Sequence, residues 1–226
     1  MPRATSLFSA EQKAAIEKAV ASAEQKTAVE IVPVVATASG RYDRAEDIIG
    51  LIGGMKAMAI AYTQLPDSSA ARTGAWDGTA VAYQIPVLLL AVFVGFMLAA
   101  FVASRLHWLR RLFTPAIQMR EETGQAARRI FYDSRIHHTK DASGLLIYVS
   151  LYERTAVLLA DAAITEKLGQ GTLDELTAGL VSGIRAGDIT AALATTINAA
   201  GNKLEAVLPR SSHDTNELSD TLILID

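Results

Sequence analysis

The sequence predicts a small α+β or α/β sandwich, a mixed sheet flanked by helices, interrupted by a hairpin of two transmembrane helices. Two observations support this prediction. Runs of branched residues typical of β-strands occur at 29–36 and 145–151, and neither region has enough apolar residues to form a core alone. Between them, the stretch from Gly78 to Ser104 contains no Asp, Glu, Lys or Arg.

Composition narrows the class of protein. The chain has 226 residues, of which 50% are apolar, with a net charge of −3 and no cysteine. This charge excludes a generally basic nucleic-acid-binding protein, and the apolar content argues against a disordered chain. Without cysteine there is no disulfide, no thiolate nucleophile, and no iron–sulfur or Cys-based zinc site.

The apolar stretch predicts a transmembrane helix over Val81–Ala103. At about 1.5 Å per residue it is long enough to cross a hydrocarbon core of about 30 Å. Aromatic residues typical of the membrane interface flank it, with Trp76 and Tyr83 at one end and Trp108 at the other.

A second apolar segment, Ile48–Leu65, carries Lys56 near its middle. A lysine at that depth costs about 2.5–3.5 kcal/mol unless its ammonium group reaches the interface or faces a partner helix. Alone, the segment also fits an interfacial amphipathic helix. Strands of one sheet lie on one side of a bilayer, however, so the chain must cross it an even number of times between them. This favours two crossings.

Basic residues predict the orientation of the hairpin. The connecting loop 66–80 contains one of them, Arg72, whereas the two flanks contain Arg41, Arg44, Arg105, Arg110, Arg111 and Arg120. Positive flanks stay in the cytoplasm, and the N-terminal residues include no apolar core of signal-peptide length. We therefore expect an inner-membrane protein with two spans and both termini in the cytoplasm, with the lipid bilayer as a partner and no nucleic acid.

The remaining elements follow in chain order. Ser9 and Gln12 form a predicted capping box that opens a helix, and Pro33 favours an edge position for the first strand. After the hairpin we expect a helix over 115–136, with an inner face of Ile117, Ala127, Ile130 and Phe131. A β-hairpin with a charged turn at 152–154 follows, then helices over 172–185, with Thr172 as a possible N-cap, and 189–207.

The predicted organisation has four parts. The first part of the cytoplasmic domain is followed by the hairpin, the second part of the domain and a polar tail, at 1–45, 46–104, 105–209 and 210–226, respectively. The tail ends in the apolar residues Leu222–Ile225, which the sequence does not place.

Known catalytic and nucleotide-binding motifs are absent, including HExxH, the P-loop, GxGxxG and GxSxG. A polar cluster before the strand 145–151 contains His137 and Asp141. If that strand pairs with 155–160 in antiparallel fashion, Asp141 lies near Asp161, and two carboxylates could bind Ca²⁺ or Mg²⁺. The same residues also fit a local turn and helix caps.

Two segments resemble the TPM domain family in its membrane-inserted bacterial branch. They are FSAEQKAAIEKAVASAEQKTAVEIVPVV at 8–35 and HHTKDASGLLIYVSLYERTAVLLADAAI at 137–164. The positions that match the second family block are His137, Thr139, Gly144, Glu153, Arg154, Leu159, Ala160, Asp161 and Ile164. The resemblance covers about residues 7–208 and implies an α/β sandwich with a central mixed sheet.

The resemblance also implies two kinds of activity. Some members are described as acid phosphatases with a divalent cation beside acidic loop residues, and Asp141 lies where such a residue would sit. Others are binding or assembly factors for membrane complexes. Our first hypothesis is therefore a domain that binds a membrane-protein partner. The alternative is a phosphatase with Asp141 and Asp161 as ligands of Ca²⁺ or Mg²⁺ and His137 as proton donor. A transporter or channel would need oligomerisation of the two spans.

Overall fold

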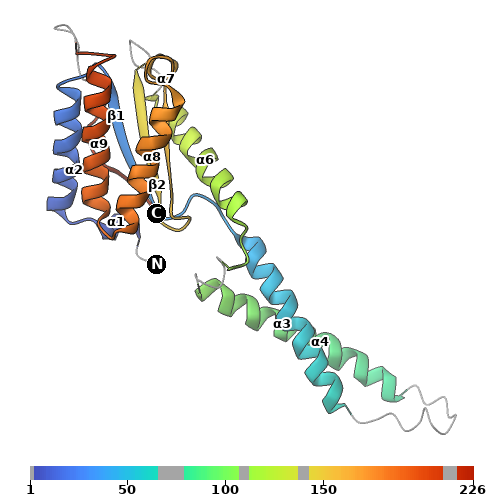
Figure 1. The fold of residues 1–226 in the computed structure, drawn as a ribbon. Helices are drawn as coiled ribbons and strands as arrows, with labels where there is room; N and C mark the ends of the chain where they lie inside the picture. The colour runs from blue at the N-terminus through green and yellow to red at the C-terminus, as the bar shows by residue number, and fades with distance from the viewer. Residues whose placement is uncertain (1–2, 66–78, 107–111, 137–142, 211–217) are drawn as a thin grey trace. The chain divides into compact units, whose positions relative to one another are not determined.

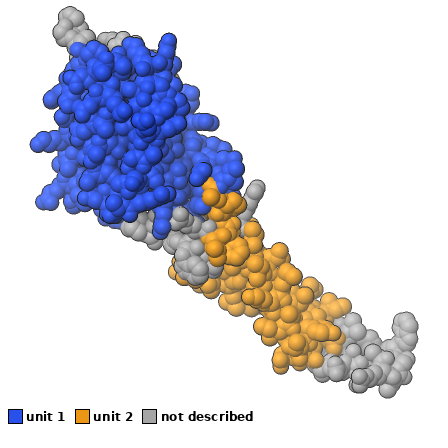
Figure 2. Space-filling model, in the orientation of Figure 1, with its two compact units in different colours: residues 1–40, 117–226 blue, residues 41–116 orange. Residues whose placement is uncertain are grey.

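The computed structural model describes residues 3–65, 79–106, 112–136, 143–210 and 218–226. The chain divides into two compact units (Figure 2). We call residues 1–40 with 117–226 the sheet domain and residues 41–116 the hairpin unit.

The sheet domain contains a mixed sheet with the strand order β3-β2-β1-β4 (Figure 1). The strands are β1 (Glu30–Ala36), β2 (Gly144–Ser150), β3 (Thr155–Ala160) and β4 (Ile223–Ile225). β1 runs parallel to β2 and β4, whereas β2 and β3 form an antiparallel pair. This confirms that the two strand segments on either side of the apolar stretch share one sheet. It also places the apolar end of the tail, which forms β4.

The prediction that Pro33 marks an edge strand is wrong for β1 as a whole, which lies between β2 and β4. Backbone N–H groups of alternate residues point to opposite neighbours in a strand. Glu30 donates to Ser143 on the β2 side and Thr37 donates to Ile225 on the β4 side, so the Pro33 nitrogen faces β4. β4 pairs only with Val34–Ala36. The missing N–H therefore lies where β1 has no paired neighbour. Proline is tolerated at such positions, so the preference of proline for an unpaired strand edge holds locally.

Helices cover both faces of the sheet (Figure 1), which confirms the predicted sandwich. On one face lie α1 (Ala4–Leu7), α2 (Ala10–Glu24), α8 (Gln170–Arg185) and α9 (Ile189–Glu205). The other face is covered by α6 (Ala116–Asp133), and α7 (Ala162–Leu168) follows β3. Successive residues of β1 alternate between the faces: Ile31 and Val35 contribute to the first core, and Val32 and Val34 to the second.

Local sequence explains how several helices begin. The capping box of α2 is confirmed: Gln12 N–H donates to Ser9 Oγ at 3.2 Å, and Ser9 N–H donates to Gln12 Oε1 at 2.9 Å. The prediction of Thr172 as an N-cap is wrong, because α8 begins at Gln170 and the Thr172 hydroxyl donates back to the Leu168 carbonyl. Gly169, with φ of 80°, separates α7 from α8 in a conformation that favours glycine.

The buried face of α6 consists of Met119, Thr123, Ala127 and Phe131, which recur every four residues. The prediction is confirmed for Ala127 and Phe131 and wrong for Ile117, which is 69% exposed. At 3.6 residues per turn, Ile117 lies about 200° around the helix from Met119.

The hairpin unit consists of α3 (Asp43–Gln64) and α4 (Thr79–Arg105), packed as an antiparallel pair through small residues. A Cβ atom on Gly53 would lie 2.3 Å from Ala99 Cβ and 2.9 Å from the Gly95 carbonyl oxygen. A Cβ atom on Gly95 would lie 2.4 Å from Ala57 Cβ. The two backbones therefore approach so closely that only glycine fits at these positions. Such small-residue contacts are typical of helices that pack in membranes.

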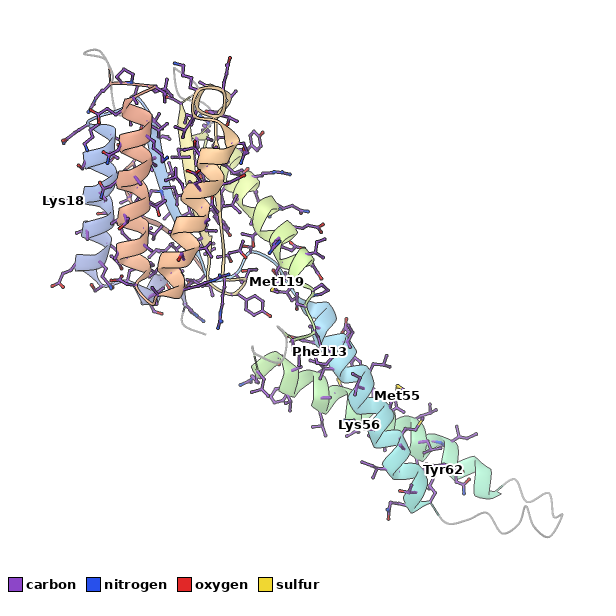
Figure 3. The ribbon with its side chains drawn as sticks, viewed as in Figure 1. Lys18, Met55, Lys56, Tyr62, Phe113 and Met119 are labelled. Atoms are coloured by element: carbon purple, nitrogen blue, oxygen red, sulfur yellow. The ribbon has the colours of Figure 1, made fainter. Side chains whose placement is uncertain are left out.

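The outer surface of the hairpin unit is apolar. Large apolar side chains that are more than half exposed include Leu51, Met55, Ile60, Leu89, Leu90, Phe93 and Leu98. Among the described helices, α4 alone is long and apolar enough to cross a membrane. Within Gln84–Arg105, the most apolar stretch of 18 residues has a mean hydropathy of 2.8 and is not buried within the structure. In α3 the apolar stretch is shorter and contains Lys56, which is exposed (Figure 3).

Candidate functional site

Asp161, a residue of the predicted site, lies at the end of the sheet where β1 and β2 begin and β3 ends. The antiparallel pairing of β2 with β3 places Asp161 beside Gly144. Asp161 N–H donates to the Gly144 carbonyl at 3.0 Å, and Gly144 N–H donates to Asp161 Oδ2 at 3.3 Å. Asp161 occupies the N-cap position of α7, as the local alternative expected, but its side chain forms no capping hydrogen bond there. Its carboxylate instead accepts the backbone N–H of Gly144, the first residue of β2.

Two of the three predicted site residues, His137 and Asp141, lie outside the described residues, so their proximity to Asp161 stays a prediction. Within the described residues, no three His, Asp or Glu side chains gather closely enough to hold a metal ion. Gly144 has no room for a side chain, because a Cβ atom there would lie 2.1 Å from the Ile136 carbonyl oxygen.

Glu24 is a buried carboxyl group at the same end of the sheet that sequence analysis missed. It is only 9% exposed, at the last position of α2, and its Oε1 accepts a hydrogen bond from Ile31 N–H at 2.9 Å. Ile31 N–H points to the side of β1 that β4 does not reach, so the Glu24 side chain supplies the missing acceptor. A sequence signal existed: Glu24 lies four positions after Val20, on the apolar face of α2.

The pKa of Glu24 is raised from 4.5 to about 8, mainly by burial. The hydrogen bond from Ile31 opposes this shift, whereas the negative charges of Glu30 and Asp220 and a hydrogen bond with Asp220 make smaller contributions to it. Glu24 is therefore protonated at neutral pH, and its hydroxyl is the donor in the hydrogen bond with Asp220. A carboxyl group with such a pKa can hold or release a proton in the physiological range.

These acidic residues line a cavity of about 150 Å³, to which Arg210 also contributes. Glu30, the first residue of β1, is buried opposite Gly144, and its Oε2 accepts a hydrogen bond from Leu218 N–H at 3.3 Å. Glu30 and Asp161 thus lie on opposite sides of the start of β2. In the described structure, Glu24, Glu30 and Asp161 each accept a backbone N–H, and such contacts position loops and strand ends.

At the other end of the sheet, the turn between β2 and β3 contains a second buried carboxylate. The turn at 152–154 is confirmed, but Glu153 is only 3% exposed and is not part of a solvated charged turn. Its Oε1 accepts hydrogen bonds from the backbone N–H groups of Ser39 and Gly40, at 2.9 and 3.3 Å, and its Oε2 accepts one from the Ser150 hydroxyl. Glu153 thereby ties this turn to the segment after β1.

Tyr148 joins the same network, since its hydroxyl lies 3.0 Å from Ser39 Oγ. Burial raises the pKa of Tyr148, the hydrogen bond with Ser39 lowers it, and the charge of Glu153 raises it. Both Tyr148 and Glu153 are therefore held within a polar network inside the domain. This network gives them a structural role in joining the segment after β1 to β2 and to the β2–β3 turn.

Comparison with known proteins gives evidence about the fold alone. No family model matches the sequence, and no curated protein matches it. Among solved structures, the chain is similar to the NMR structure of the BA42 protein from the psychrophilic bacterium Bizionia argentinensis. The two share 16% sequence identity with a TM-score of 0.57, over 96% of this chain and 94% of that one. At this identity, the similarity establishes a shared fold.

Proposed function

We propose that this chain is a membrane-anchored TPM-like domain that binds a membrane-protein partner. In this proposal α3 and α4 cross the bacterial inner membrane as a hairpin, and the sheet domain and both termini lie in the cytoplasm. The observation that carries it is the apolar outer surface of the α3–α4 pair. Each 100 Å² of apolar surface left in water costs about 2.5 kcal/mol, and soluble monomers rarely expose large contiguous apolar patches.

Connectivity supports two crossings. β1 and β2 are hydrogen-bonded neighbours, one before and one after the hairpin unit. If α4 crosses the bilayer, the chain must cross once more to bring β2 beside β1. α3 is the available helix, because its glycines pack directly against α4. In this arrangement the charge of Lys56 makes insertion of α3 less favourable. Its long side chain can reduce this cost by extending along the helix toward the membrane interface.

A binding role is supported by what the polar residues do. The sequence lacks common catalytic motifs, and Glu24, Glu30, Glu153 and Asp161 accept backbone hydrogen bonds that hold the fold together. A domain anchored in this way is confined near other membrane proteins. A pulldown of the full chain in mild detergent should recover a specific membrane protein, and recovery of lipid and chaperones alone would count against this proposal.

Cysteine labelling tests the topology directly, because the chain contains no native cysteine. Ser69→Cys places a thiol between α3 and α4, and Ala38→Cys places one after β1 at an exposed position. With a membrane-impermeant thiol reagent on spheroplasts, we expect labelling of Ser69→Cys alone. Ala38→Cys should react only after permeabilisation, which controls for its accessibility. The reverse pattern, or labelling of both variants in intact spheroplasts, would overturn the topology.

A metal-assisted phosphatase is the second candidate. Asp161 supports it, because its carboxylate lies at the start of β2, the strand that follows the segment containing His137 and Asp141. The test is hydrolysis of a small aryl phosphate by the full chain, with and without Ca²⁺ or Mg²⁺. Metal-dependent turnover that Asp141→Asn and Asp161→Asn abolish, while Asp174→Asn on the exposed side of α8 retains it, would support this function. Turnover that both site variants keep would refute it.

A further inference from the structure

The sheet domain contains a second, larger cavity, on the face of the sheet that α8 covers. Its volume is about 380 Å³, within the range of about 300–1,000 Å³ that is typical of small-molecule sites. Its walls are mainly apolar and come from α1, the end of β2 with the turn after it, the start of β3, and α8. The apolar lining residues are Leu7, Val149, Leu151, Val181 and Ile184.

Two arginines line this cavity, Arg154 from the β2–β3 turn and Arg185 from the end of α8. Neither guanidinium forms an ion pair or hydrogen bond with a described residue, and no Asp or Glu is among the lining residues. Arg154 has φ of 54°, an uncommon conformation for a residue other than glycine. The hydrogen bonds of the neighbouring Glu153 fix this turn, so the position of Arg154 is built into the fold.

The cavity offers few other polar groups to a ligand. The Ser150 hydroxyl donates to Glu153, and the Thr155 hydroxyl donates to the Glu153 carbonyl at 3.2 Å. An extended peptide would need partners for its own N–H and C=O groups, whereas the lining side chains other than the arginines are apolar or already hydrogen-bonded. An alkyl chain needs none, and guanidinium groups match phosphate oxygens in charge and geometry.

We propose that this cavity binds a single-chain anionic amphiphile, with an alkyl chain between β2 and α8 and a phosphate head at Arg154 and Arg185. The proposal stands on the sheet domain alone and does not depend on the membrane topology or on the partner proposed above. The competing explanation is that the two arginine stems simply cover apolar surface while their charged groups remain in water.

Calorimetric titration of the full chain in phosphatidylcholine nanodiscs tests the proposal, with empty nanodiscs as the reference. Dodecyl phosphate should bind saturably at one molecule per chain. Dodecylphosphocholine, in which a choline group neutralises the head, should bind at least tenfold more weakly, and inorganic phosphate should show no saturable binding. Equal affinity for the two dodecyl compounds would show that the arginines do not recognise the head and would overturn the proposal.

Variants identify the site. Arg154→Gln combined with Arg185→Gln should weaken dodecyl phosphate binding at least tenfold, whereas Arg128→Gln, exposed on α6 at the opposite face, should leave it unchanged. Val181→Trp should abolish binding by filling the cavity. The arginine variants alter exposed side chains, so they carry the test if Val181→Trp does not fold. Unchanged binding in the double arginine variant would refute the assignment.

Discussion

Glu24 should make the stability of the sheet domain depend on pH in a direction opposite to that of most carboxylates. Its pKa is about 8 in the folded chain and 4.5 as its ordinary value. Between these values the folded chain binds one proton more than the unfolded chain. The free energy of unfolding should therefore fall as pH rises, by up to about 1.4 kcal/mol per pH unit. From pH 5.5 to pH 7.5 the loss amounts to about 3 kcal/mol at most.

Glu24→Gln isolates this contribution, because glutamine has the shape and hydrogen-bonding capacity of the protonated acid. Its amide oxygen can accept from Ile31 N–H, and its amide nitrogen can donate to Asp220, the partner that raises the pKa of Glu24. The variant should match the wild-type protein near pH 5 and exceed it in stability near pH 8. The charges of Glu30, Asp220 and Arg210 around the cavity are the same in both proteins.

Urea unfolding of the full chain in a neutral detergent, followed by far-UV circular dichroism at pH 5 to 8.5, measures this effect. Glu17→Gln, a substitution on a partly exposed position of the same helix, is the matched control and should keep the wild-type slope. The reasoning fails if wild type and Glu24→Gln lose stability at the same rate with pH. It also fails if Glu24→Gln is the less stable protein at pH 8.

Three further predictions concern packing and hydrogen bonding. Glu153→Ala leaves the N–H groups of Ser39 and Gly40 without their acceptor, and each unsatisfied donor should lower the free energy of unfolding by about 1–3 kcal/mol. Glu153→Gln keeps an acceptor, so in the same urea assay it should lower the free energy of unfolding by less than half as much. Gly53→Leu should force α3 and α4 apart, because its Cβ alone would lie 2.3 Å from Ala99 Cβ. Spin labels at Met55→Cys and Val94→Cys should then show a longer, broader distance distribution, with Ile52→Leu as the control that leaves it unchanged. Ser9→Ala removes one half of the capping box and should destabilise the domain by about 1 kcal/mol, whereas an effect no larger than that of Ser6→Ala would contradict the role of the cap.

Sequence reasoning predicted those features of the fold that depend on local pattern. The strands at 29–36, 145–151 and 155–160, the capping box at Ser9 and the inner positions Ala127 and Phe131 follow from periodicity and side-chain chemistry over a few residues. The pairing of the first two strands was also predicted, because neither region could form a core alone.

Two of the errors arise where distant parts of the chain meet, and a third is local. The position of Pro33 depends on β4, which is formed by residues far along the chain and leaves part of β1 uncovered. Glu24 is buried because β1 supplies a donor to it and Asp220 approaches it, neither of which is visible in the helix pattern. The local error concerns Thr172, which has the chemistry of an N-cap. Gly169 instead ends α7 and is the N-cap of α8, so α8 begins at Gln170, two residues before Thr172.

The pairing of β1 with β2 has a consequence for biosynthesis. Roughly 100 residues separate Ala36 from Gly144, including the whole hairpin unit. At about 5–20 residues per second, the ribosome needs about 5–20 s to deliver the partner of β1 after β1 itself has emerged. During this interval both edges of the apolar strand β1 are unpaired, which favours aggregation. Pro33 and Glu30, which are costly in an ordinary interior strand, would discourage another copy from pairing with β1 while the hairpin unit is being synthesised.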